Sequence, residues 1–285
     1  MPEGDTLHRI AGQLRPVLAG ETIAAADARP TRSVPAVDAA SLVGRRVAGV
    51  EAVGKHLMIA LDDGRAIHSH LGMTGAWHVY DRGEAWKKPA DRAALVLSTA
   101  THTVVHFSPK QLELVAGRTL RRDPYLQRLG PDLMLPDVDL AAVVPRLRVH
   151  DAAPIGEAVM NQTIAAGIGN VYKSETLFLA KINPWLAVRG LSDEQLGEYL
   201  SLTHKLMRRN RTGGKRTTRF AAGGGRLWVY GRRGDACYVC GATVLARRQG
   251  EAARNTFWCP RCQPGPGPTP SADAQRRLPP IKGCS

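Results

Sequence analysis

Residues 161–175 read NQTIAAGIGNVYKSE, and this stretch decides how the second half of the chain is expected to fold. An apolar run leads into Gly167 and Gly169, which predict the end of one helix and a tight turn. Asn170 then stands where the N-cap of the next helix is expected. Backbone N–H groups at a helix start can bind a phosphate, aided by the helix dipole. The alternative interpretation is an ordinary helical hairpin whose glycines permit close packing.

Downstream of this stretch, two C-x-x-C pairs are separated by 18 residues. The four cysteines are Cys237, Cys240, Cys259 and Cys262. This spacing is typical of a zinc ribbon, in which four thiolates bind one tetrahedral ion, and the intervening residues predict a β-hairpin. Because cysteine fills all four positions, we expect one structural Zn²⁺ with no position open for a substrate. Redox chemistry is the alternative.

The first three residues, Met1-Pro2-Glu3, predict covalent chemistry. Proline in second place permits removal of Met1, which would leave a secondary amine beside the Glu3 carboxylate. Such an amine can attack an aldehyde-level carbon and form an iminium. While Met1 remains, the nitrogen is an amide and cannot do so. The alternative is that Met-Pro-Glu is a common start without a catalytic role.

The chain has 285 residues, with 39 Lys and Arg against 25 Asp and Glu, and therefore a formal net charge of +14. This surplus favours a polyanionic partner, DNA or RNA before an anionic membrane surface. No apolar run approaches the ~20 residues of a membrane-spanning helix, and the start lacks a signal-peptide pattern. We therefore expect a cytoplasmic bacterial protein with no membrane partner. The fifth cysteine, Cys284, is expected to have no structural role.

The first half of the chain predicts one helix followed by strands. Helical spacing of apolar residues starts after Glu3, with Gly4 and Asp5 as cap residues, Pro16 as a kink and Gly20 as the end. In residues 57–61, Leu, Ile and Leu occupy every second position, which predicts a strand that ends in a turn at 62–64. Residues 94–97 and 104–107 predict the two strands of another hairpin. Because the predicted strands do not alternate with helices, an antiparallel β-sandwich is expected.

The predicted organisation divides the chain into a catalytic β-sandwich domain, a proline-rich linker, a helical DNA-binding domain, a zinc ribbon and a disordered tail. In that order, the expected boundaries are 1–117, 118–153, 154–226, 227–263 and 264–285. Within the helical domain, helices are expected at about 155–165, 171–180 and 192–209.

Four motifs occur in one order: Met1-Pro2-Glu3-Gly4, Gly54-Lys55, residues 161–175 and the cysteine ribbon. Together they resemble the formamidopyrimidine-DNA glycosylase / endonuclease VIII family of base-excision repair enzymes, from Met1 to about Gln263. The resemblance implies an α+β fold with an N-terminal antiparallel β-sandwich and flanking helices. It also implies a C-terminal helix–two-turn–helix domain with a β-hairpin zinc ribbon. The implied partner is damaged DNA, duplex or partly single-stranded, with no organic cofactor and a monomeric enzyme.

The resemblance also implies four catalytic residues. Pro2 is similar to the nucleophile that attacks the sugar carbon bearing the damaged base, and Glu3 to the acid that helps open the sugar ring. Lys55 is similar to a lysine near the substrate phosphate that acts in β-elimination. Arg254 is similar to the ribbon arginine that grips phosphate and serves δ-elimination. From the residues alone, an exposed strand-edge Lys55 and a solvated Arg254 are the alternatives.

For DNA binding, the resemblance implies Asn170 and Arg128 as contacts to the backbone. The loop at 68–75 is similar to one that fills the gap left by a flipped base, through His70, Met73 or Leu71. The alternative places Leu71 and Met73 in a strand core. The basic residues at 205–219 are expected to contact phosphates.

Three departures from the family pattern bear on the substrate. Many relatives carry Pro-Glu where this chain has Asp5-Thr6, so strand cleavage is expected to be weaker or to use Asp5. Residues 109–112 lack the Arg and Phe of enzymes that act on oxidised purines, and the loop at 211–227 is short for their lid. These features favour the endonuclease VIII side, of the actinobacterial type, and oxidised pyrimidines.

Three functions therefore stand as alternatives. The first is a bifunctional DNA glycosylase and abasic-site lyase that removes oxidised pyrimidines through a Pro2 Schiff base and nicks the strand by β,δ-elimination. The second is an abasic-site lyase or single-strand-lesion enzyme of the same fold. The third is a non-catalytic zinc-ribbon DNA-binding protein, which would need no free amine at Pro2.

Overall fold

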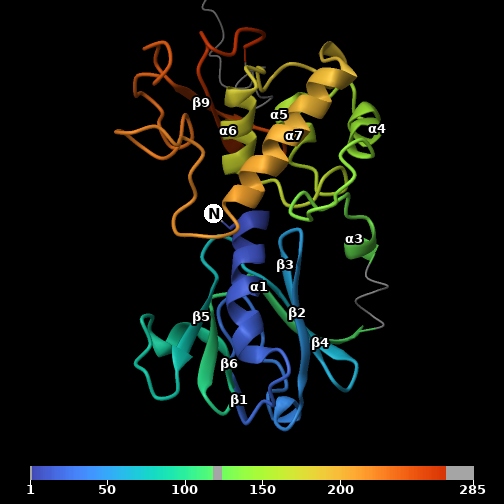
Figure 1. Ribbon diagram of the computed structural model, residues 1–285, viewed down its shortest axis with the longest axis vertical. Coiled ribbons are helices and arrows are strands. Elements are labelled where there is room, and N and C mark those ends of the chain that lie inside the picture. The colour runs from blue at the N-terminus through green and yellow to red at the C-terminus, as the bar shows by residue number, and fades with distance from the viewer. Residues whose placement is uncertain (1, 118–123, 268–285) are drawn as a thin grey trace, which may run out of the picture.

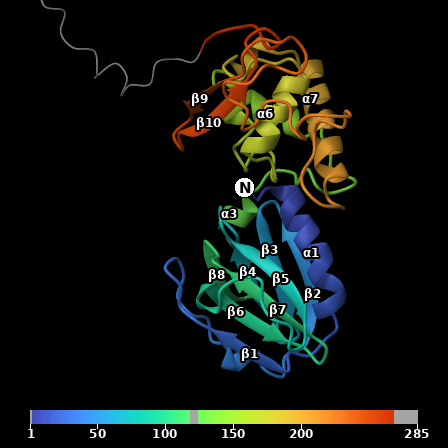
Figure 2. The same ribbon diagram turned by 90° about the vertical axis from the view of Figure 1, so that its left-hand side faces the viewer.

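The computed structural model describes residues 2–117 and 124–267, so Met1, residues 118–123 and residues 268–285, with Cys284, lie outside the described part. The protein has two lobes stacked along its longest axis (Figure 1). The N-terminal lobe holds the first helix and eight strands, and the C-terminal lobe holds the other helices and a β-hairpin. The start of the first helix lies where the two lobes meet (Figure 2).

Helix α1 spans Gly4–Leu18 and connects this junction with the core of the N-terminal lobe. The predicted caps, Gly4 and Asp5, are wrong by one or two positions, because Glu3 is the N-cap residue. The helix runs past Pro16, which lies in its last turn, so only Val17 and Leu18 follow the hydrogen bond that the proline removes. Gly20, with φ of +87°, follows the helix end in a conformation that favours glycine.

The N-terminal lobe contains two four-stranded antiparallel sheets, with the orders β1-β6-β7-β5 and β2-β3-β4-β8. The strands are β1 Ala25–Ala28, β2 Val47–Val53, β3 His56–Leu61, β4 Arg65–His70, β5 Ala76–Asp81, β6 Ala93–Ser98, β7 His102–Phe107 and β8 Gln111–Ala116. Short 3₁₀ helices lie at Ala40–Leu42 and Ala90–Arg92. The predicted antiparallel sandwich is confirmed.

Alternation along β3 places this strand in the core as expected. Leu57, Ile59 and Leu61 are buried, whereas Ala60 is exposed on the other face. The predicted hairpin of residues 94–107 is also confirmed, because β6 and β7 pair with Leu97 opposite Val104. One apolar core joins both sheets and α1.

The C-terminal lobe consists of helices and one hairpin. Its elements are α3 Pro124–Gln127, α4 Val143–Arg148, α5 Ile155–Ala158, α6 Asn170–Leu179, the 3₁₀ helix Val188–Gly190, α7 Asp193–Arg209, β9 Leu245–Gln249 and β10 Arg254–Trp258. Helix α7 starts with a capping box formed by Ser192 and Gln195. Helices α6 and α7 agree closely with the predicted ranges at 171–180 and 192–209.

The helix predicted at 155–165 is wrong, because α5 ends at Ala158. The Asn161 side chain accepts hydrogen bonds from the Thr163 backbone N–H and hydroxyl at 3.0 and 2.8 Å. Such a local turn competes with helix continuation. The predicted N-cap of the next helix is also wrong, since Gly169 is the cap and Asn170 is the first helical residue.

Part of the segment predicted as a linker packs inside the C-terminal lobe. Buried apolar residues of this segment join the core formed by the helices: Leu133, Met134, Val143 and Leu147. A proline-rich pattern shows where regular structure breaks, but it does not show which side chains are buried.

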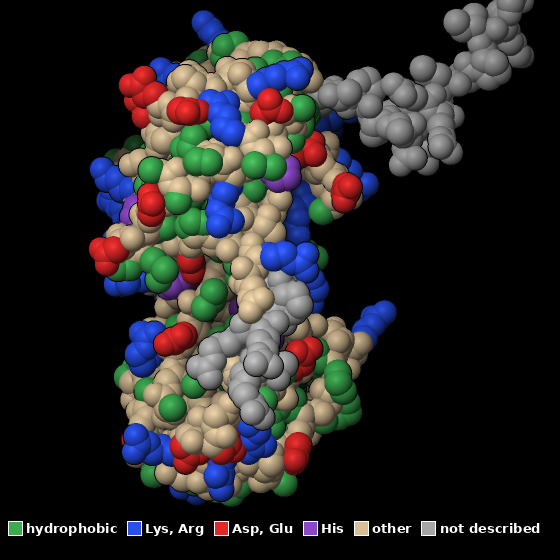
Figure 3. All heavy atoms as spheres, turned by 90° about the vertical axis from the view of Figure 1, so that its right-hand side faces the viewer, with side chains coloured by type: hydrophobic (Ala, Val, Ile, Leu, Met, Phe, Trp, Pro, Cys, Tyr) green, Lys and Arg blue, Asp and Glu red, His purple; other side chains and the backbone are tan. Residues whose placement is uncertain are grey.

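On the face shown in Figure 3, Lys and Arg side chains are interspersed with Asp and Glu side chains over both lobes. Neither charge is concentrated in one patch on this face. None of the described helices is long and apolar enough to cross a membrane.

Candidate functional site

The N-terminus of α6 is occupied by Glu3, which links the two lobes. The Glu3 side chain is fully buried, and its carboxylate accepts N–H bonds from Val171 at 2.7 Å and from Gly169 and Tyr172 at 3.2 Å each. A negative charge is favourable at this end of a helix. The chain's own carboxylate therefore takes three of the donors at this helix start, and phosphate binding by the remaining Asn170 N–H stays a prediction.

Glycines are required where the two lobes approach here. A Cβ at Gly169 would lie 2.3 Å from the carboxyl carbon of Glu3, and one at Gly4 would lie 2.9 Å from the Cα of Gly167. The Gly4 N–H also donates to the Gly167 carbonyl at 2.9 Å. The glycines of the 161–175 stretch thus permit the first residues of the chain to pack against the C-terminal lobe.

A cavity of about 1040 Å³ lies beside this contact. It brings together five of the predicted catalytic and DNA-binding residues: Pro2, Lys55, His70, Met73 and Arg254. They come from the chain start, the β2–β3 turn, the end of β4, the loop after β4 and the start of β10. Sequence-distant segments of both lobes therefore line one cavity.

Lys55 is held in the turn between β2 and β3. Gly54, with φ of +56°, forms this turn, and its N–H donates to the Asp132 carboxylate at 2.7 Å. The Lys55 ammonium donates to the Ile168 carbonyl. Burial lowers the pKa of Lys55 to about 8, an effect that Glu3 opposes and Arg254 reinforces. The alternative of an exposed strand-edge lysine is wrong.

Arg254 begins β10 on the hairpin that follows the first cysteine pair. Arg254 lies opposite Gln249 in the pairing of β9 with β10. Arg254 is exposed and lines the cavity. This placement allows the guanidinium to face an anion that enters the cavity.

The three candidate gap-filling residues, His70, Leu71 and Met73, differ in how far they are exposed. Leu71 is 1% exposed and belongs to the core, so its predicted role is wrong. Met73 is 77% exposed, which contradicts its alternative placement in a strand core. His70 accepts the Gly72 N–H at Nδ1, and burial followed by Lys110 lowers its pKa to about 4. His70 and Met73 remain predicted to contact DNA.

Asn170 and Arg128 are not among the residues that line the cavity. Asn170 is 4% exposed, and its amide donates to the Asn255 carbonyl at 2.8 Å, which attaches the hairpin to α6. Its Oδ1 atom is buried and has no hydrogen-bond partner in the described part. Arg128 is exposed after α3. Their contacts with DNA stay predictions.

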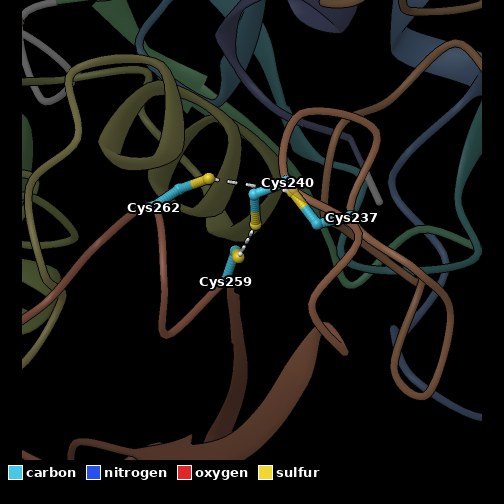
Figure 4. Close-up of side chains that lie close together, drawn as sticks. All are labelled: Cys237, Cys240, Cys259 and Cys262. Atoms are coloured by element: carbon cyan, nitrogen blue, oxygen red, sulfur yellow. Dashed lines mark hydrogen bonds between the residues drawn. The ribbon is translucent and has the colours of Figure 1, made fainter.

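The four cysteines of the ribbon form a cluster that fits a metal ion (Figure 4). All four Sγ atoms lie within 4.8 Å of one another, with 3.9 Å between Cys237 and Cys262 and 3.4 Å between Cys240 and Cys259. Tetrahedral Zn²⁺ with Zn–S bonds near 2.3 Å places its sulfurs about 3.8 Å apart. The donor set and spacing therefore fit a structural zinc ion.

The sequence analysis missed the partner of Asp5. Arg216 lies in the basic segment expected to contact phosphates, but it is only 13% exposed and points inward. Its guanidinium donates to both Asp5 oxygens, at 2.5 and 2.8 Å, and lies 3.7 Å from Glu3. The Tyr172 hydroxyl also donates to Asp5, at 3.1 Å. The prediction that Arg216 contacts DNA is therefore wrong.

Glu175 was also missed. It is fully buried in α6, and its carboxylate accepts N–H bonds from Trp228, Val229 and Tyr230 and a hydroxyl bond from Thr218. Burial raises the pKa of Glu175, although these donors oppose the shift. Glu175 thus holds the chain that leads from the basic loop into the ribbon.

Replacing Asp5 by Asn is expected to lower the free energy of unfolding by about 3 kcal/mol, because buried Arg216 would lose the nearer of its two carboxylate partners and keep only the more distant Glu3. Urea unfolding measures this loss. The matched control is Asp27→Asn, which breaks an exposed pair with Arg29 and should cost less than about 1 kcal/mol. Equal stability of the two variants would show that the Asp5–Arg216 pair contributes nothing special.

Comparisons with known proteins agree with this architecture. Residues 1–122 match the family model of the formamidopyrimidine-DNA glycosylase N-terminal domain, and residues 129–222 match that of its H2TH domain. The chain is 39% identical over 273 residues to "Probable endonuclease 8 2" of Streptomyces coelicolor, covering 95% of this chain and 96% of the relative. It is 36% identical over 269 residues to "DNA-(apurinic or apyrimidinic site) lyase Nei2" of Mycolicibacterium smegmatis, covering 92% and 99%.

A similar solved structure is the complex of wild-type Lactococcus lactis Fpg (MutM) with DNA containing N7-benzyl-Fapy-dG. The TM-score is 0.78 at 25% identity, with 93% of this chain and 100% of that chain covered. The fold and the site thus define a two-lobed protein of the DNA-repair glycosylase and lyase class. The chain belongs to the formamidopyrimidine-DNA glycosylase / endonuclease VIII family, on the endonuclease VIII side, as its motifs predicted.

Proposed function

We propose that this protein is a bifunctional DNA glycosylase and abasic-site lyase that removes oxidised pyrimidines. The observation that carries the proposal is the single cavity shared by Pro2, Lys55 and Arg254 at the junction of the lobes. The names of the relatives, endonuclease 8 and abasic-site lyase, support the same reaction class. We further propose that it acts as a monomer on chromosomal DNA in the bacterial cytoplasm.

In the proposed reaction, removal of Met1 makes the Pro2 nitrogen a secondary amine. This nitrogen attacks the sugar carbon that bears the damaged base, and the base leaves. Glu3, directly next in sequence, supplies a proton to the ring oxygen, which opens the sugar and gives an iminium with Pro2. The positive charge of nearby Lys55 favours the neutral, nucleophilic form of the amine.

Strand cleavage then follows from two eliminations. Lys55, whose pKa of about 8 leaves part of it neutral near that pH, suits proton removal in the β-elimination. Arg254 can stabilise the phosphate that leaves in the δ-elimination, because its planar fork donates to phosphate oxygens. Hydrolysis of the remaining imine restores the Pro2 amine.

In this proposal Zn²⁺ is structural. Cys237, Cys240, Cys259 and Cys262 would bind one ion, and the ion would stiffen the hairpin that carries Arg254. With four thiolates as ligands, the ion has no position for a substrate, so each chemical step belongs to the side chains of the cavity.

The choice of oxidised pyrimidines rests on residues 109–112, which lack the Arg and Phe of the purine-specific relatives. An abasic-site lyase of the same fold is the second candidate, and the name of the Mycolicibacterium relative favours it. A non-catalytic zinc-ribbon protein is the third, and a covalent intermediate distinguishes it from the other two.

Borohydride trapping tests these candidates. Protein whose mass shows that Met1 is absent is mixed with duplexes that contain thymine glycol, 5-hydroxycytosine, 8-oxoguanine or an abasic site. We expect a covalent protein–DNA band on the two oxidised pyrimidines and on the abasic site. A band on abasic DNA alone would favour the lyase without base selection. DNA binding without any band would favour the non-catalytic candidate.

A further inference from the structure

Lys173 is a buried lysine for which the proposed reaction has no use. It lies in the first turn of α6 and is only 1% exposed. It nevertheless lines the same cavity as Pro2, Lys55 and Arg254. A lysine is rarely buried to this degree without a partner for its charge.

The Lys173 ammonium is held in a fixed position by the hairpin. It donates to the Thr256 hydroxyl oxygen at 2.6 Å, and the Thr256 hydroxyl in turn donates to the Gln249 amide oxygen at 2.8 Å. The Gln249 amide donates to the Pro184 carbonyl at 2.9 Å. These bonds orient the ammonium, but they bring no negative charge to it.

Within residues 2–117 and 124–267, no carboxylate forms an ion pair with Lys173. Burial lowers its pKa to about 7, and Arg254 on β10 lowers it further. Glu157 of α5 and Glu3 oppose this shift. Glu157 and Glu3 act on the Lys173 ammonium only through space, so the ammonium has neutral hydrogen-bond partners and no carboxylate in contact with it.

A cation in this environment is costly in the protein alone, because Lys173 is 1% exposed and forms no ion pair with a carboxylate of the described residues. The cost falls when an anion enters the cavity and accepts hydrogen bonds from both cations. In a protein that binds DNA, the available anion is the phosphodiester group.

We infer that Lys173 is a further DNA-phosphate ligand, which binds one phosphate of the damaged strand together with Arg254. This inference rests on the proposed function, because it requires DNA in the cavity. Lys173 acts by binding and takes no part in forming or breaking a covalent bond.

The inference predicts a pH dependence with a definite sign. Lys173 must be protonated to bind phosphate, and the bound phosphate raises its pKa above the value of about 7 in the protein alone. Binding therefore takes up a proton. DNA affinity is highest below pH 7 and falls as the pH rises through 7, until the pKa of the bound state is exceeded.

The test compares zinc-loaded full-length protein with Lys173→Met in binding a duplex that contains tetrahydrofuran, a stable abasic analogue. At pH 6 we expect the variant to bind roughly tenfold more weakly, because one charge-assisted hydrogen bond is lost. The slope of log K against log salt concentration should become shallower by about 0.9, which is the contribution of one phosphate contact. Proton uptake, measured at pH 8 by calorimetry in two buffers, should decrease, because Lys173 is mostly neutral there before DNA binds.

Two further variants control for the loss of a lysine elsewhere and for the loss of charge at position 173. Lys181→Met removes an exposed lysine just beyond the end of the same helix and should leave affinity, salt slope and proton uptake unchanged. Lys173→Arg keeps a permanent positive charge, so it should preserve binding at pH 6 and reduce the weakening at pH 8.5 to the part that titration of Lys55 contributes. This variant also decides the question if Lys173→Met fails to fold.

Three results would overturn the inference. Unchanged affinity and salt slope in Lys173→Met would show that no phosphate contacts this residue. Slower cleavage with unchanged affinity would instead indicate proton transfer by Lys173. If the unaltered protein binds no DNA, the inference and the proposed function fail together, whereas the first two results leave the proposed function intact.

Discussion

A chain that retains one extra residue in front of Pro2 is expected to lose covalent trapping and strand cleavage by a factor on the order of 10⁴ or more. The extra residue converts the Pro2 nitrogen into an amide, which has no lone pair available for attack on the sugar carbon. The buried contact between Glu3 and the start of α6 should survive, since it involves atoms that follow Pro2. Single-turnover cleavage of a thymine glycol duplex measures the loss.

The control uses the same extended chain after a protease has removed the extension and left Pro2 first. We expect cleavage and trapping to return, and binding of tetrahydrofuran-containing DNA to be similar before and after removal. If the extended chain cleaves DNA at full rate, the nucleophile is another amine, and Lys55 would be the first residue to test.

Removal of zinc is expected to unfold the hairpin and abolish cleavage while the N-terminal lobe stays folded. Structural zinc sites contribute about 10–16 kcal/mol of apparent binding free energy near pH 7, so the ribbon should not persist without the ion. Without the hairpin, Arg254 leaves the cavity and Asn170 loses its bond to Asn255. Hydrogen exchange should become fast at residues 245–258 and remain slow at residues 57–61.

Cys240→Ser and Cys284→Ser separate the zinc ligand from the leftover cysteine. We expect Cys240→Ser to lower the zinc content and cleavage together, and Cys284→Ser to change neither. A Cys240→Ser protein with full cleavage and slow exchange in the hairpin would contradict the structural role of the ion.

Several elements were predictable because their signals are local. A C-x-x-C turn presents two thiolates to one ion whatever surrounds it, and the four cysteines do converge. Alternation at residues 57–61 predicts which face of β3 is buried, because successive side chains point to opposite faces. The convergence of Pro2, Lys55 and Arg254 on one cavity was implied by family resemblance and could not follow from spacing.

Other features depend on which distant groups meet. The sequence at the start of α6 predicted phosphate binding. In the structure, the Gly169 N–H donates to the carboxylate of Glu3, which lies 166 residues earlier in the chain. Arg216 looked like a phosphate ligand in a basic loop, yet it pairs with Asp5 across 211 residues. Composition identifies a cation but does not determine the direction of its side chain or its partner.

The sequence by itself determined the antiparallel sandwich and the cysteine cluster, because periodicity and motif spacing act over a few residues. The family followed from the resemblance of four motifs that occur in one order along the chain. Only the tertiary structure decided that the Glu3 carboxylate accepts the N–H groups at the start of α6, that Arg216 is buried against Asp5 and that Lys173 lines the cavity. These outcomes depend on desolvation and on contacts between the two lobes, where the energy of a charge is set by neighbours far away in the chain.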